Sequence, residues 1–238
     1  MVKKINTKFT KLIKYYSLIN HNLIYENEAI NRYKINNNLA IQGPKGAKLQ
    51  ELKDSITMIK NCELKKSSTN IVFSDGNPNS KIMIIGEGPG ANEDLEGVPF
   101  IGRTGELLDK MLLSINLDRD NVYISNVVNY RPPENRIPTK EEIARYLPYL
   151  IKHVEIINPK ILILLGSTAL NAIIGNDKVI SDIRGKWIKK RIGSCDTLVI
   201  ASFHPAFLMR QPEQKKKSWM DLKMIKKKIL DLNIKIEK

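Results

Sequence analysis

The histidine in the segment Ser202-Phe203-His204-Pro205 is the strongest candidate for chemistry in this chain. It directly follows a short apolar run, Thr197–Ser202, and the proline after it restricts the direction of the chain. Histidine is the side chain that most often transfers protons or donates hydrogen bonds in active sites. His21 lies in a basic N-terminal segment and His153 inside a helical pattern, so we interpret both as structural or exposed.

A glycine-rich turn with one carboxylate follows the first strongly apolar run. Its sequence, Gly86-Glu87-Gly88-Pro89-Gly90-Ala91, fits the G-x-G-x-x-A pattern of a dinucleotide-binding turn. Pro89 removes an amide donor, and the acidic segment 92–97 would repel a pyrophosphate and is not expected to begin a helix. A dinucleotide-dependent Rossmann enzyme is therefore a distant alternative. The other interpretation is a tight turn that needs glycine and presents the carboxylate of Glu87 at the end of a strand.

Two further side chains suit the recognition of a planar, polar ring. Phe100 lies between Pro99 and Gly102, where it either packs in the core or offers a stacking surface. Asn126 interrupts the apolar run Val122–Val128, and a buried amide needs hydrogen-bond partners. Those partners are either backbone groups or the polar edge of a base, which can pair with both the donor and the acceptor of an amide.

The elements that must position these residues alternate between short strands and helices. Near-continuous apolarity over few residues is typical of strands buried on both faces of a parallel sheet. The predicted strands are Lys81–Gly86, Val122–Val128, Ile161–Gly166 and Thr197–Ser202. Apolar spacing or a capping box predicts helices over Thr104–Ile115, from Thr139 through Ile151 with a kink at Pro148, over Ser167–Ile174 and over residues 216–232.

This alternation predicts an α/β fold, a three-layer α/β/α sandwich around a short, mainly parallel sheet, whose ligands bind beyond the carboxyl ends of the strands. The first fifty residues differ, because residues 8–34 have helix-like apolar spacing and residues 35–47 have the composition of a loop. We therefore predict a basic, helical N-terminal extension and linker over residues 1–50 and a catalytic domain over residues 51–238.

Composition excludes several classes of protein. The chain has 238 residues, of which 42% are hydrophobic and 27% charged, so it is not a wholly disordered chain. No apolar run approaches the roughly 20 residues of a membrane-spanning helix. The two cysteines, Cys62 and Cys195, exclude a disulfide scaffold and a zinc site made of several cysteines. We expect a cytoplasmic monomer with no membrane partner.

The positive charge is concentrated at the two ends of the chain. Of a formal net charge of +14, residues 1–60 carry +7 (eleven Lys/Arg, four Asp/Glu) and residues 209–238 carry +6 (ten Lys/Arg, four Asp/Glu). Clustered lysines bind polyanions by releasing counterions. The alternatives are that these lysines only maintain solubility or reflect a compositional bias, and charge alone does not separate nucleic acid from an anionic membrane surface.

Taken together, these segments resemble the family 4 uracil-DNA glycosylases. The resemblance runs from about Glu51 to Leu222 and rests on three segments that occur in order at strand ends, GEGPGANEDLEGVPFIGRTGELLDKML, VYISNVVNYRPPENR and FHPAFLMR. It implies hydrolysis of the N-glycosidic bond of a flipped-out deoxyuridine in DNA, which leaves an abasic site and belongs to base-excision repair. The implied partner is uracil-containing DNA, single- or double-stranded.

The resemblance also implies roles in base recognition and catalysis. His204 matches the histidine that faces the oxygen of the departing base. Glu87 and Gly88 match the loop beside the attacked sugar carbon, where Glu87 either orients water or acts by its charge. Phe100 matches the aromatic side chain that stacks on uracil, and Asn126 matches the amide that pairs with its polar edge.

The segment after the histidine matches the loop that enters the space left by the flipped nucleotide. Leu208 and Met209 are its apolar wedge, and Arg210 offers a cation to a phosphate. An alternative of another class is a catalytically weakened relative that binds uracil-containing or single-stranded DNA without cleaving it.

The chain departs from the family pattern at the iron–sulfur cluster. Family members carry four cysteines around a four-iron, four-sulfur cluster, and here only Cys62 matches a ligand position. Ile59, Tyr130 and Tyr146 occupy the other three positions. We therefore expect no cluster, no metal and no other cofactor. The loop after Tyr130 also lacks the insertion that carries a nucleophilic histidine in a covalently trapping relative.

Overall fold

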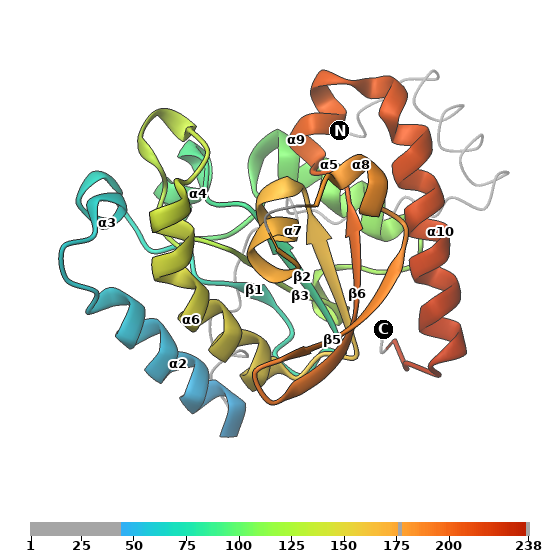
Figure 1. Cartoon of the computed structure of the whole chain (residues 1–238), viewed down its shortest axis with the longest axis horizontal. Coiled ribbons are helices and arrows are strands. Elements are labelled where there is room, and N and C mark those ends of the chain that lie inside the picture. Colours follow the sequence, from blue (N-terminus) through green and yellow to red (C-terminus); the bar gives the residue numbers. More distant parts are fainter. Residues whose placement is uncertain (1–43, 176–177, 237–238) are drawn as a thin grey trace, which may run out of the picture. The chain divides into compact units, whose positions relative to one another are not determined.

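A mixed sheet forms the centre of the computed structural model, which describes residues 44–175 and 178–236. The expected helix over residues 8–34 lies outside this range. The described part has a six-stranded sheet in the order β1-β3-β2-β4-β6-β5 (Figure 1). Its strands are β1 Asp75–Gly76, β2 Ile82–Gly86, β3 Tyr123–Asn126, β4 Ile161–Leu165, β5 Trp187–Ile192 and β6 Cys195–Ser202.

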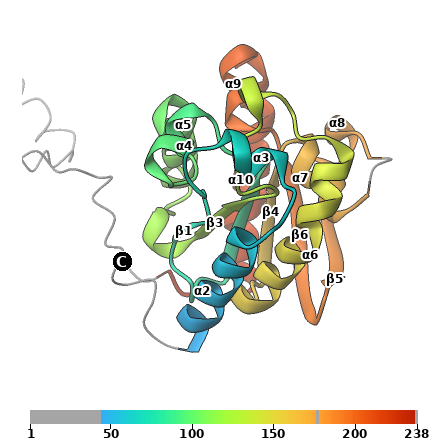
Figure 2. The same cartoon turned by 90° about the vertical axis from the view of Figure 1, so that its left-hand side faces the viewer.

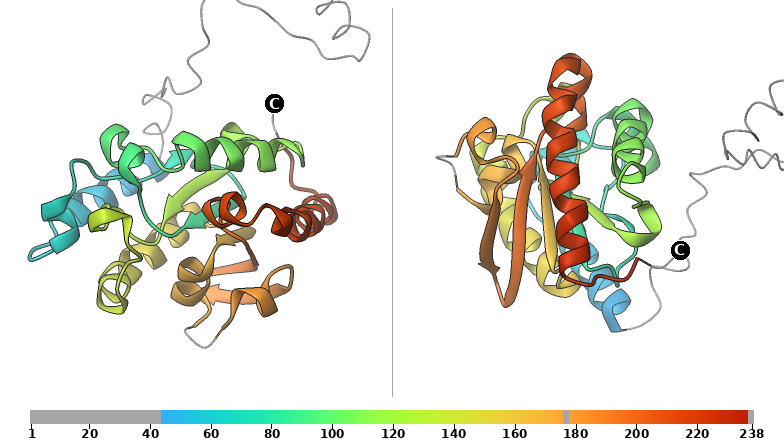
Figure 3. Two further views of the ribbon diagram at one scale, coloured as in Figure 1. Left: turned by 90° about the horizontal axis from the view of Figure 1, so that it is seen from above. Right: turned by 90° about the vertical axis from the view of Figure 1, so that its right-hand side faces the viewer.

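Helices cover both faces of this sheet. The α-helices of the described residues are α2 Pro44–Thr57, α3 Glu63–Ser67, α4 Ala91–Glu96, α5 Gly102–Leu113, α6 Lys140–Ile157, α7 Ser167–Ile173, α8 Ile180–Ile183, α9 Pro205–Arg210 and α10 Lys215–Asp231. Helices α2, α6 and α7 contribute to one apolar core, and α5, α9 and α10 contribute to another. In Figures 2 and 3, α10 accordingly lies across the sheet from α2 and α6. The predicted three-layer α/β/α sandwich is confirmed.

The four predicted strands are present and form a parallel centre. Strand β2 pairs in parallel with β3 and β4, and β4 pairs in parallel with β6. Successive residues of β2 alternate between the two cores, since Ile82 and Ile84 pack on the α5 side whereas Met83 and Ile85 pack on the α6 side. Burial on both faces is the physical reason for the near-continuous apolar runs.

The two edge strands were not predicted. Strand β1 has two residues and pairs antiparallel with β3, and β5 pairs antiparallel with β6. Strand β5 reads WIKKRI, with Lys189 and Arg191 exposed, so it lacks the apolar run by which the central strands were found. Charged side chains are typical of an edge strand, where they oppose pairing with another chain.

The four helices predicted within the described residues are present as α5, α6, α7 and α10, whereas the start of α2 in the predicted loop 35–47 and the helix in the acidic segment 92–97 were not expected. Thr139 caps α6 as the capping box predicted, accepting a hydrogen bond from the Glu142 amide at 3.2 Å. Pro148 lies inside α6. The expectation that no helix begins after Gly90 was wrong, because α4 occupies Ala91–Glu96.

The predicted boundary at residue 50 falls inside a helix. Helix α2 begins at Pro44, ends at Thr57 and packs against α6 through buried residues that include Leu49, Leu52 and Ile56. Residues 44–50 are thus part of a helix that packs on this sheet layer. No helix among the described residues is both long and apolar enough to span a membrane.

His153 is a buried member of the α6 side of the core. It is 2% exposed, its ring stacks on Phe73 at a centroid distance of 4.6 Å, and its Nε2 lies 2.8 Å from the Tyr123 hydroxyl. Burial disfavours the charged imidazolium and lowers the pKa of His153 to about 3. The sequence interpretation of His153 as a structural histidine is consistent with this environment.

We expect this histidine to make the fold less stable in acid. Between pH 6.5 and 3 the unfolded chain binds a proton at residue 153 that the folded chain does not, so the free energy of unfolding decreases as the pH falls. Between pH 7.5 and 5.0 this loss is about 2 kcal/mol. Urea unfolding at these two pH values measures it, and His153→Gln, which does not titrate but can bond to the Tyr123 hydroxyl, is the control. An equal pH dependence in wild type and variant would contradict the prediction.

Candidate active site

The carboxyl ends of the four parallel strands bring the predicted site residues together. Gly86, the last residue of β2, is opposite Asn126, the last residue of β3. Leu165 at the end of β4 is opposite Ser202 at the end of β6, and His204 follows two residues later. The pairing order of the strands thus sets Asn126, Glu87, the start of α7 and His204 in a row along one edge of the sheet.

Phe100 reaches this edge from the loop before α5. Its ring lies against Gly86, and its centroid is 5.4 Å from that of the His204 ring, with 30° between the ring planes. A methyl group on Gly86 would overlap both the Phe100 ring and the Asn126 amide oxygen. Glycine at the end of β2 therefore allows the aromatic ring and the amide to approach each other across the strand.

The backbone of Phe100 is held in an uncommon conformation. Its φ is +55°, which is unusual for a bulky residue and is maintained only when the surroundings impose it. The Arg119 guanidinium donates to the carbonyl oxygens of Pro99 and Phe100 and pairs with Asp75 at 2.6 Å. These charge-assisted hydrogen bonds fix the peptide that carries the ring.

The Glu93 carboxylate ties the loop of Phe100 to the glycine-rich turn. It is 8% exposed and accepts hydrogen bonds from the Gly90 amide at 3.1 Å and the Ile101 amide at 3.0 Å. This arrangement explains why the acidic segment forms a helix, because its carboxylate points inward to backbone donors. It also argues against a dinucleotide site, since the Gly90 amide and the start of α4 already face a negative charge.

The Asn126 amide differs from its neighbour Asn129 in its partners. Asn129 donates to the Val72 carbonyl oxygen at 3.1 Å, so its amide is satisfied by backbone. Asn126 is 3% exposed, and no side-chain hydrogen bond to it is found within the described part of the chain. A nearly buried amide of this kind is available to pair with a ligand that enters beside Phe100.

His204 is a neutral donor whose tautomer is fixed by the backbone. Its Nδ1 accepts a hydrogen bond from the Ala206 amide at 3.2 Å, so that it caps α9. Burial, and secondarily the charge of Arg210, lowers the pKa of His204 to about 4, so the ring is neutral at pH 7. In a neutral imidazole whose Nδ1 is an acceptor, Nε2 carries the proton. The site therefore has an Nε2–H donor beside Phe100.

Thr168, in the helix that follows β4, also belongs to the site, and the sequence analysis did not identify it. It lies in the first turn of α7, is 7% exposed, and its hydroxyl donates to Oε2 of Glu87. Gly166, two residues earlier, has φ +91° and lies close to the His204 side chain, where a Cβ would be 3.1 Å from that of His204. A glycine and a hydroxyl directly after a buried strand are the signal that would have identified this turn.

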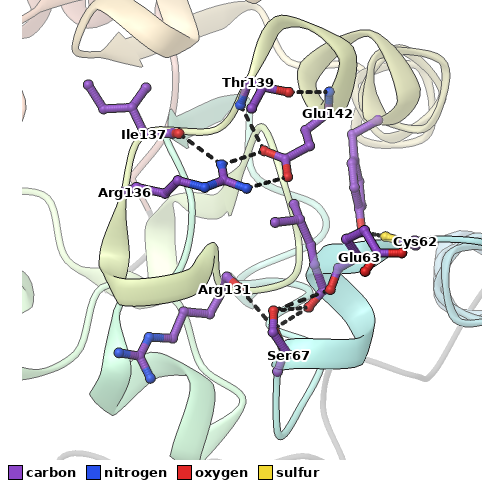
Figure 4. A network of polar contacts seen from close by, with 11 residues as sticks. Cys62, Glu63, Ser67, Arg131, Arg136, Ile137, Thr139 and Glu142 are labelled. Atoms are coloured by element: carbon purple, nitrogen blue, oxygen red, sulfur yellow. Dashed lines mark hydrogen bonds and ion pairs between the residues drawn. The ribbon is translucent and has the colours of Figure 1, made fainter.

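A proline-rich loop between β3 and α6 borders Gly88. A Cβ on Gly88 would meet Val128 at 2.7 Å and Pro132 at 3.8 Å. Figure 4 shows how this loop is tied to α6, because the Arg136 guanidinium donates to both Glu142 carboxylate oxygens, at 2.7 and 2.8 Å. Gly88 thus lies between the turn that carries Glu87 and a loop that is anchored to the next helix.

The three residues expected to contact DNA have different environments. Leu208, predicted with Met209 to be an apolar wedge, is 1% exposed and packs in the core on the α5 side, and its role in contact with DNA stays a prediction. Successive residues of a helix point in different directions, and in α9 Leu208 faces the core, Met209 is half-buried, and Arg210 at the end of the helix is exposed. Met209 and Arg210 remain the candidates for contact with DNA.

The positions of the family's cluster ligands are filled by packed side chains. The Cys62 sulfur lies 3.3 Å from the Tyr146 hydroxyl, and Cys62, Tyr130 and Tyr146 are 4%, 5% and 0% exposed. Ile59 packs against the same core. Burial raises the pKa of both tyrosines, so their hydroxyls stay protonated at pH 7 and are poor iron ligands. Cys195, the first residue of β6, does not belong to this set, and its thiol donates a hydrogen bond to the Asn158 amide oxygen. These residues do not fit a four-iron cluster.

Comparisons with known proteins agree with this geometry. Residues 73–226 match the family model of the uracil DNA glycosylase superfamily. The chain is 38% identical over 183 residues to a type-4 uracil-DNA glycosylase of Sulfurisphaera tokodaii, covering 75% of this chain and 83% of that protein. It is 44% identical over 150 residues to a type-4 uracil-DNA glycosylase of Thermotoga maritima, covering 63% and 77% respectively. A similar protein of Archaeoglobus fulgidus is 38% identical over 181 residues, covering 74% and 91%.

The close approach at Gly86 generates a stability prediction. We expect Gly86→Ala to lower the free energy of unfolding by about 1–3 kcal/mol, because the added methyl overpacks the space between Asn126 and Phe100. Urea unfolding measures the loss. In the double variant Gly86→Ala/Phe100→Leu, the smaller leucine should relieve part of the overlap. The double variant should therefore lose less free energy of unfolding than the sum of the losses in the two single variants. Strict additivity would mean that Phe100 does not pack on Gly86.

Proposed function

Because the chain belongs to the uracil-DNA glycosylase superfamily, we propose that it hydrolyses the N-glycosidic bond of deoxyuridine in DNA, releasing uracil and leaving an abasic site for base-excision repair. The observation that carries this proposal is the set of three side chains at the sheet edge. They are a nearly buried amide with no side-chain hydrogen bond to the described residues, an aromatic ring and a neutral imidazole donor. Each suits one feature of a flat, polar, uncharged base.

The base must leave the DNA stack to reach this site. Extrusion costs a few kcal/mol and is least costly at a weak pair or in a single strand. In the site, the Phe100 ring offers a stacking surface, and the free donor and acceptor of Asn126 pair with the polar edge of uracil. Because Gly86 has no side chain, the Phe100 ring and the Asn126 amide can lie close enough together to contact the same base.

His204 acts on charge that develops during bond cleavage. As the N-glycosidic bond breaks, its electron pair moves onto uracil and negative charge accumulates on a ring oxygen. The Nε2–H of His204 donates a hydrogen bond to that oxygen. A neutral donor in a buried site stabilises this oxygen without prior charge on the imidazole, and the Ala206 amide holds the correct tautomer.

Glu87 is proposed to position the attacking water. Thr168 occupies its Oε2, which leaves Oε1 to accept a hydrogen bond from water beside the sugar carbon. The water oxygen forms a bond to that carbon as the bond to uracil breaks, the water proton passes through the carboxylate to solvent, and the uracil anion takes a proton from solvent. The negative charge of Glu87 also favours the positive charge that builds on the sugar.

We propose that this activity needs no cofactor. The positions of the cluster ligands hold one thiol and two protonated tyrosines, which do not fit a cubane. Every role above is filled by a side chain or a backbone group. The described residues 44–175 and 178–236 also contain no group of three or more His, Cys, Asp or Glu side chains that could hold a metal ion.

The DNA partner would be contacted by the exposed end of α9. Arg210 offers its charge to a phosphate, and Met209 lies beside it. We further propose that the enzyme is a cytoplasmic monomer, which is consistent with two buried, free cysteines. Sedimentation of the purified chain with and without a uracil-containing oligonucleotide tests the monomer.

The decisive test of the function uses a uracil-containing oligonucleotide. The purified chain, incubated in chelator with single- or double-stranded substrate, should release uracil and leave alkali-labile abasic sites. Thymine- and cytosine-containing oligonucleotides are the controls. Tight binding to the uracil oligonucleotide without release would instead identify a binding protein, and release only with added divalent metal would contradict the mechanism.

His204→Ala should reduce the cleavage rate by about 10²–10³, because it removes a donor to developing charge. Binding to DNA with a non-cleavable abasic analogue should change much less. Since the pKa of His204 is lowered to about 4, the rate of the wild type should show no step near pH 6.5 from protonation of this ring. An equal loss in binding and rate would make His204 a ground-state contact.

Thr168→Val should lower kcat by about 10–100-fold, because a hydrogen bond to a carboxylate is worth about 1.5–3 kcal/mol. KM should stay within about twofold, and Thr168→Ser should retain most of the activity. These steady-state constants separate positioning of Glu87 from a general loss of structure, which thermal unfolding of each variant checks. Full activity in Thr168→Val would show that Glu87 needs no such partner.

Protein purified without oxygen should contain no stoichiometric iron and no visible cluster absorbance, yet be fully folded. The packing of Cys62 and Tyr146 replaces metal–ligand bonds between α3 and α6. Iron analysis and an absorption spectrum measure this directly. A brown protein with four irons per chain, whose folding is sensitive to chelators, would show a cluster built from other ligands or between chains.

A further inference from the structure

A basic notch opens beside the candidate active site, between α5 and the segment that follows His204. It is a cavity of about 190 Å³. Its lining residues come from α5, the end of α9 and the start of α10, and they are Arg103, Glu106, Leu107, Lys110, Met209 and Lys215. Of these residues, only Met209 is already a candidate for contact with DNA.

The notch has the charge of an anion site. Three cations, Arg103, Lys110 and Lys215, face one carboxylate, Glu106. All four residues are exposed, and within the described part of the chain the three cations take part in no ion pair. Because their charges are not neutralised by neighbouring carboxylates, they are available to a partner, and cations of this kind bind phosphate by releasing counterions.

The spacing of the cations fits a chain of phosphates better than a single ion. Arg103 and Lys110 are seven residues apart on α5, which places them on the same face, two turns and about 10 Å from each other. Lys215 approaches from the start of α10 on the other side of the notch. An extended, repeating anion can contact all three cations along this length.

The position of the notch relates it to the base site. Arg103 comes three residues after Phe100, which forms one wall of the base site, and Met209 is one residue from the exposed Arg210. Helices α5 and α9 are in contact, so the notch lies where these two parts of the site meet. A nucleotide whose base contacts Phe100 and His204 would have its neighbouring phosphates near this surface.

We propose that the notch binds the phosphodiester backbone of the DNA strand next to the extruded nucleotide. Arg103, Lys110 and Lys215 contact one or two successive phosphates there, and Met209 contributes apolar contact to the sugar. This inference rests on the proposed function, because it assumes that the base site takes a nucleotide from DNA.

A second basic surface offers a matched control. The groove at the opposite end of the sheet is lined by Lys160, Lys189, Lys190 and Arg191, with Asp196 as its acid. It has at least as much positive charge as the notch. It lies near Leu198 of β6, four residues and about 13 Å along the strand before Ser202, at the amino ends of the parallel strands. If positive charge alone attracted DNA, this groove would contribute as much as the notch.

The test compares two triple variants that each remove three charges. Arg103→Gln/Lys110→Gln/Lys215→Gln changes the notch, and Lys160→Gln/Lys189→Gln/Lys190→Gln changes the groove. Binding to a duplex with a non-cleavable abasic analogue is measured from 50 to 200 mM salt. The notch variant should bind at least about tenfold more weakly at the lowest salt, and its slope of log K against log[salt] should be about 1–2 shallower, at about 0.9 per phosphate. The groove variant should keep the wild-type slope.

Each outcome decides the proposal. Equal slopes in wild type and notch variant, or equal changes in both triple variants, would overturn it. Lys110 lies away from the base site, so Lys110→Gln alone should make the slope of log K against log[salt] shallower by about one phosphate contact. Thermal unfolding checks that all variants are folded. Uracil release by the wild type, measured in the same experiment, separates the two proposals. Release by the wild type without a slope change in the notch variant refutes only the proposal for the notch. A slope change in the notch variant without release by the wild type refutes only the glycosylase activity.

Discussion

The geometry of the site depends on the absence of a side chain at the end of β2. The Phe100 ring and the Asn126 amide oxygen both lie so close to Gly86 that a Cβ atom at this position would be 2.4 Å from each of them. The ring can stay there only with a positive φ at Phe100, and that backbone conformation is imposed by the Arg119 guanidinium and the Glu93 carboxylate. Strand pairing of Gly86 with Asn126 then sets the amide in register. One glycine, two ionic anchors and one strand register therefore define the geometry of the site before any ligand enters.

The central strands and most of the site could be predicted from the sequence because their physical cause is local. A strand that is buried on both faces must be apolar throughout, and polar side chains such as Asn126 or His204 stand out against it. Where the cause is tertiary, the sequence was uninformative or misleading. Glu93 and Asp94 belong to an acidic segment that was not expected to begin a helix, yet both lie in α4, are buried and accept backbone hydrogen bonds. The sequence also does not show that Leu208 packs inward, because this depends on how α9 is turned on the core.

The side chains at the positions that the resemblance assigns to cluster ligands pack in the apolar core on the α6 side. Cys62 and the hydroxyl of Tyr146 are in contact, and Tyr130 packs in the same apolar cluster. In a metal-bound brace, four bonds to one inorganic group hold separate segments together. Here, many weak contacts between α3, α6 and the loop after β3 connect the same segments, supported by the hydrogen bond from Ser68 to the Arg131 carbonyl oxygen at 3.1 Å.

The neutral state of His204 has a consequence for how a polyanion meets this surface. A positive imidazole inside the pocket would draw phosphate groups inward, where they would compete with the base. With His204 uncharged and a carboxylate at Glu87, these two groups bring no positive charge to the site, while Arg103, Lys110, Lys215 and Arg210 are exposed. For the DNA substrate proposed above, this distribution of charge favours phosphates at the exposed cations and an uncharged base in the site.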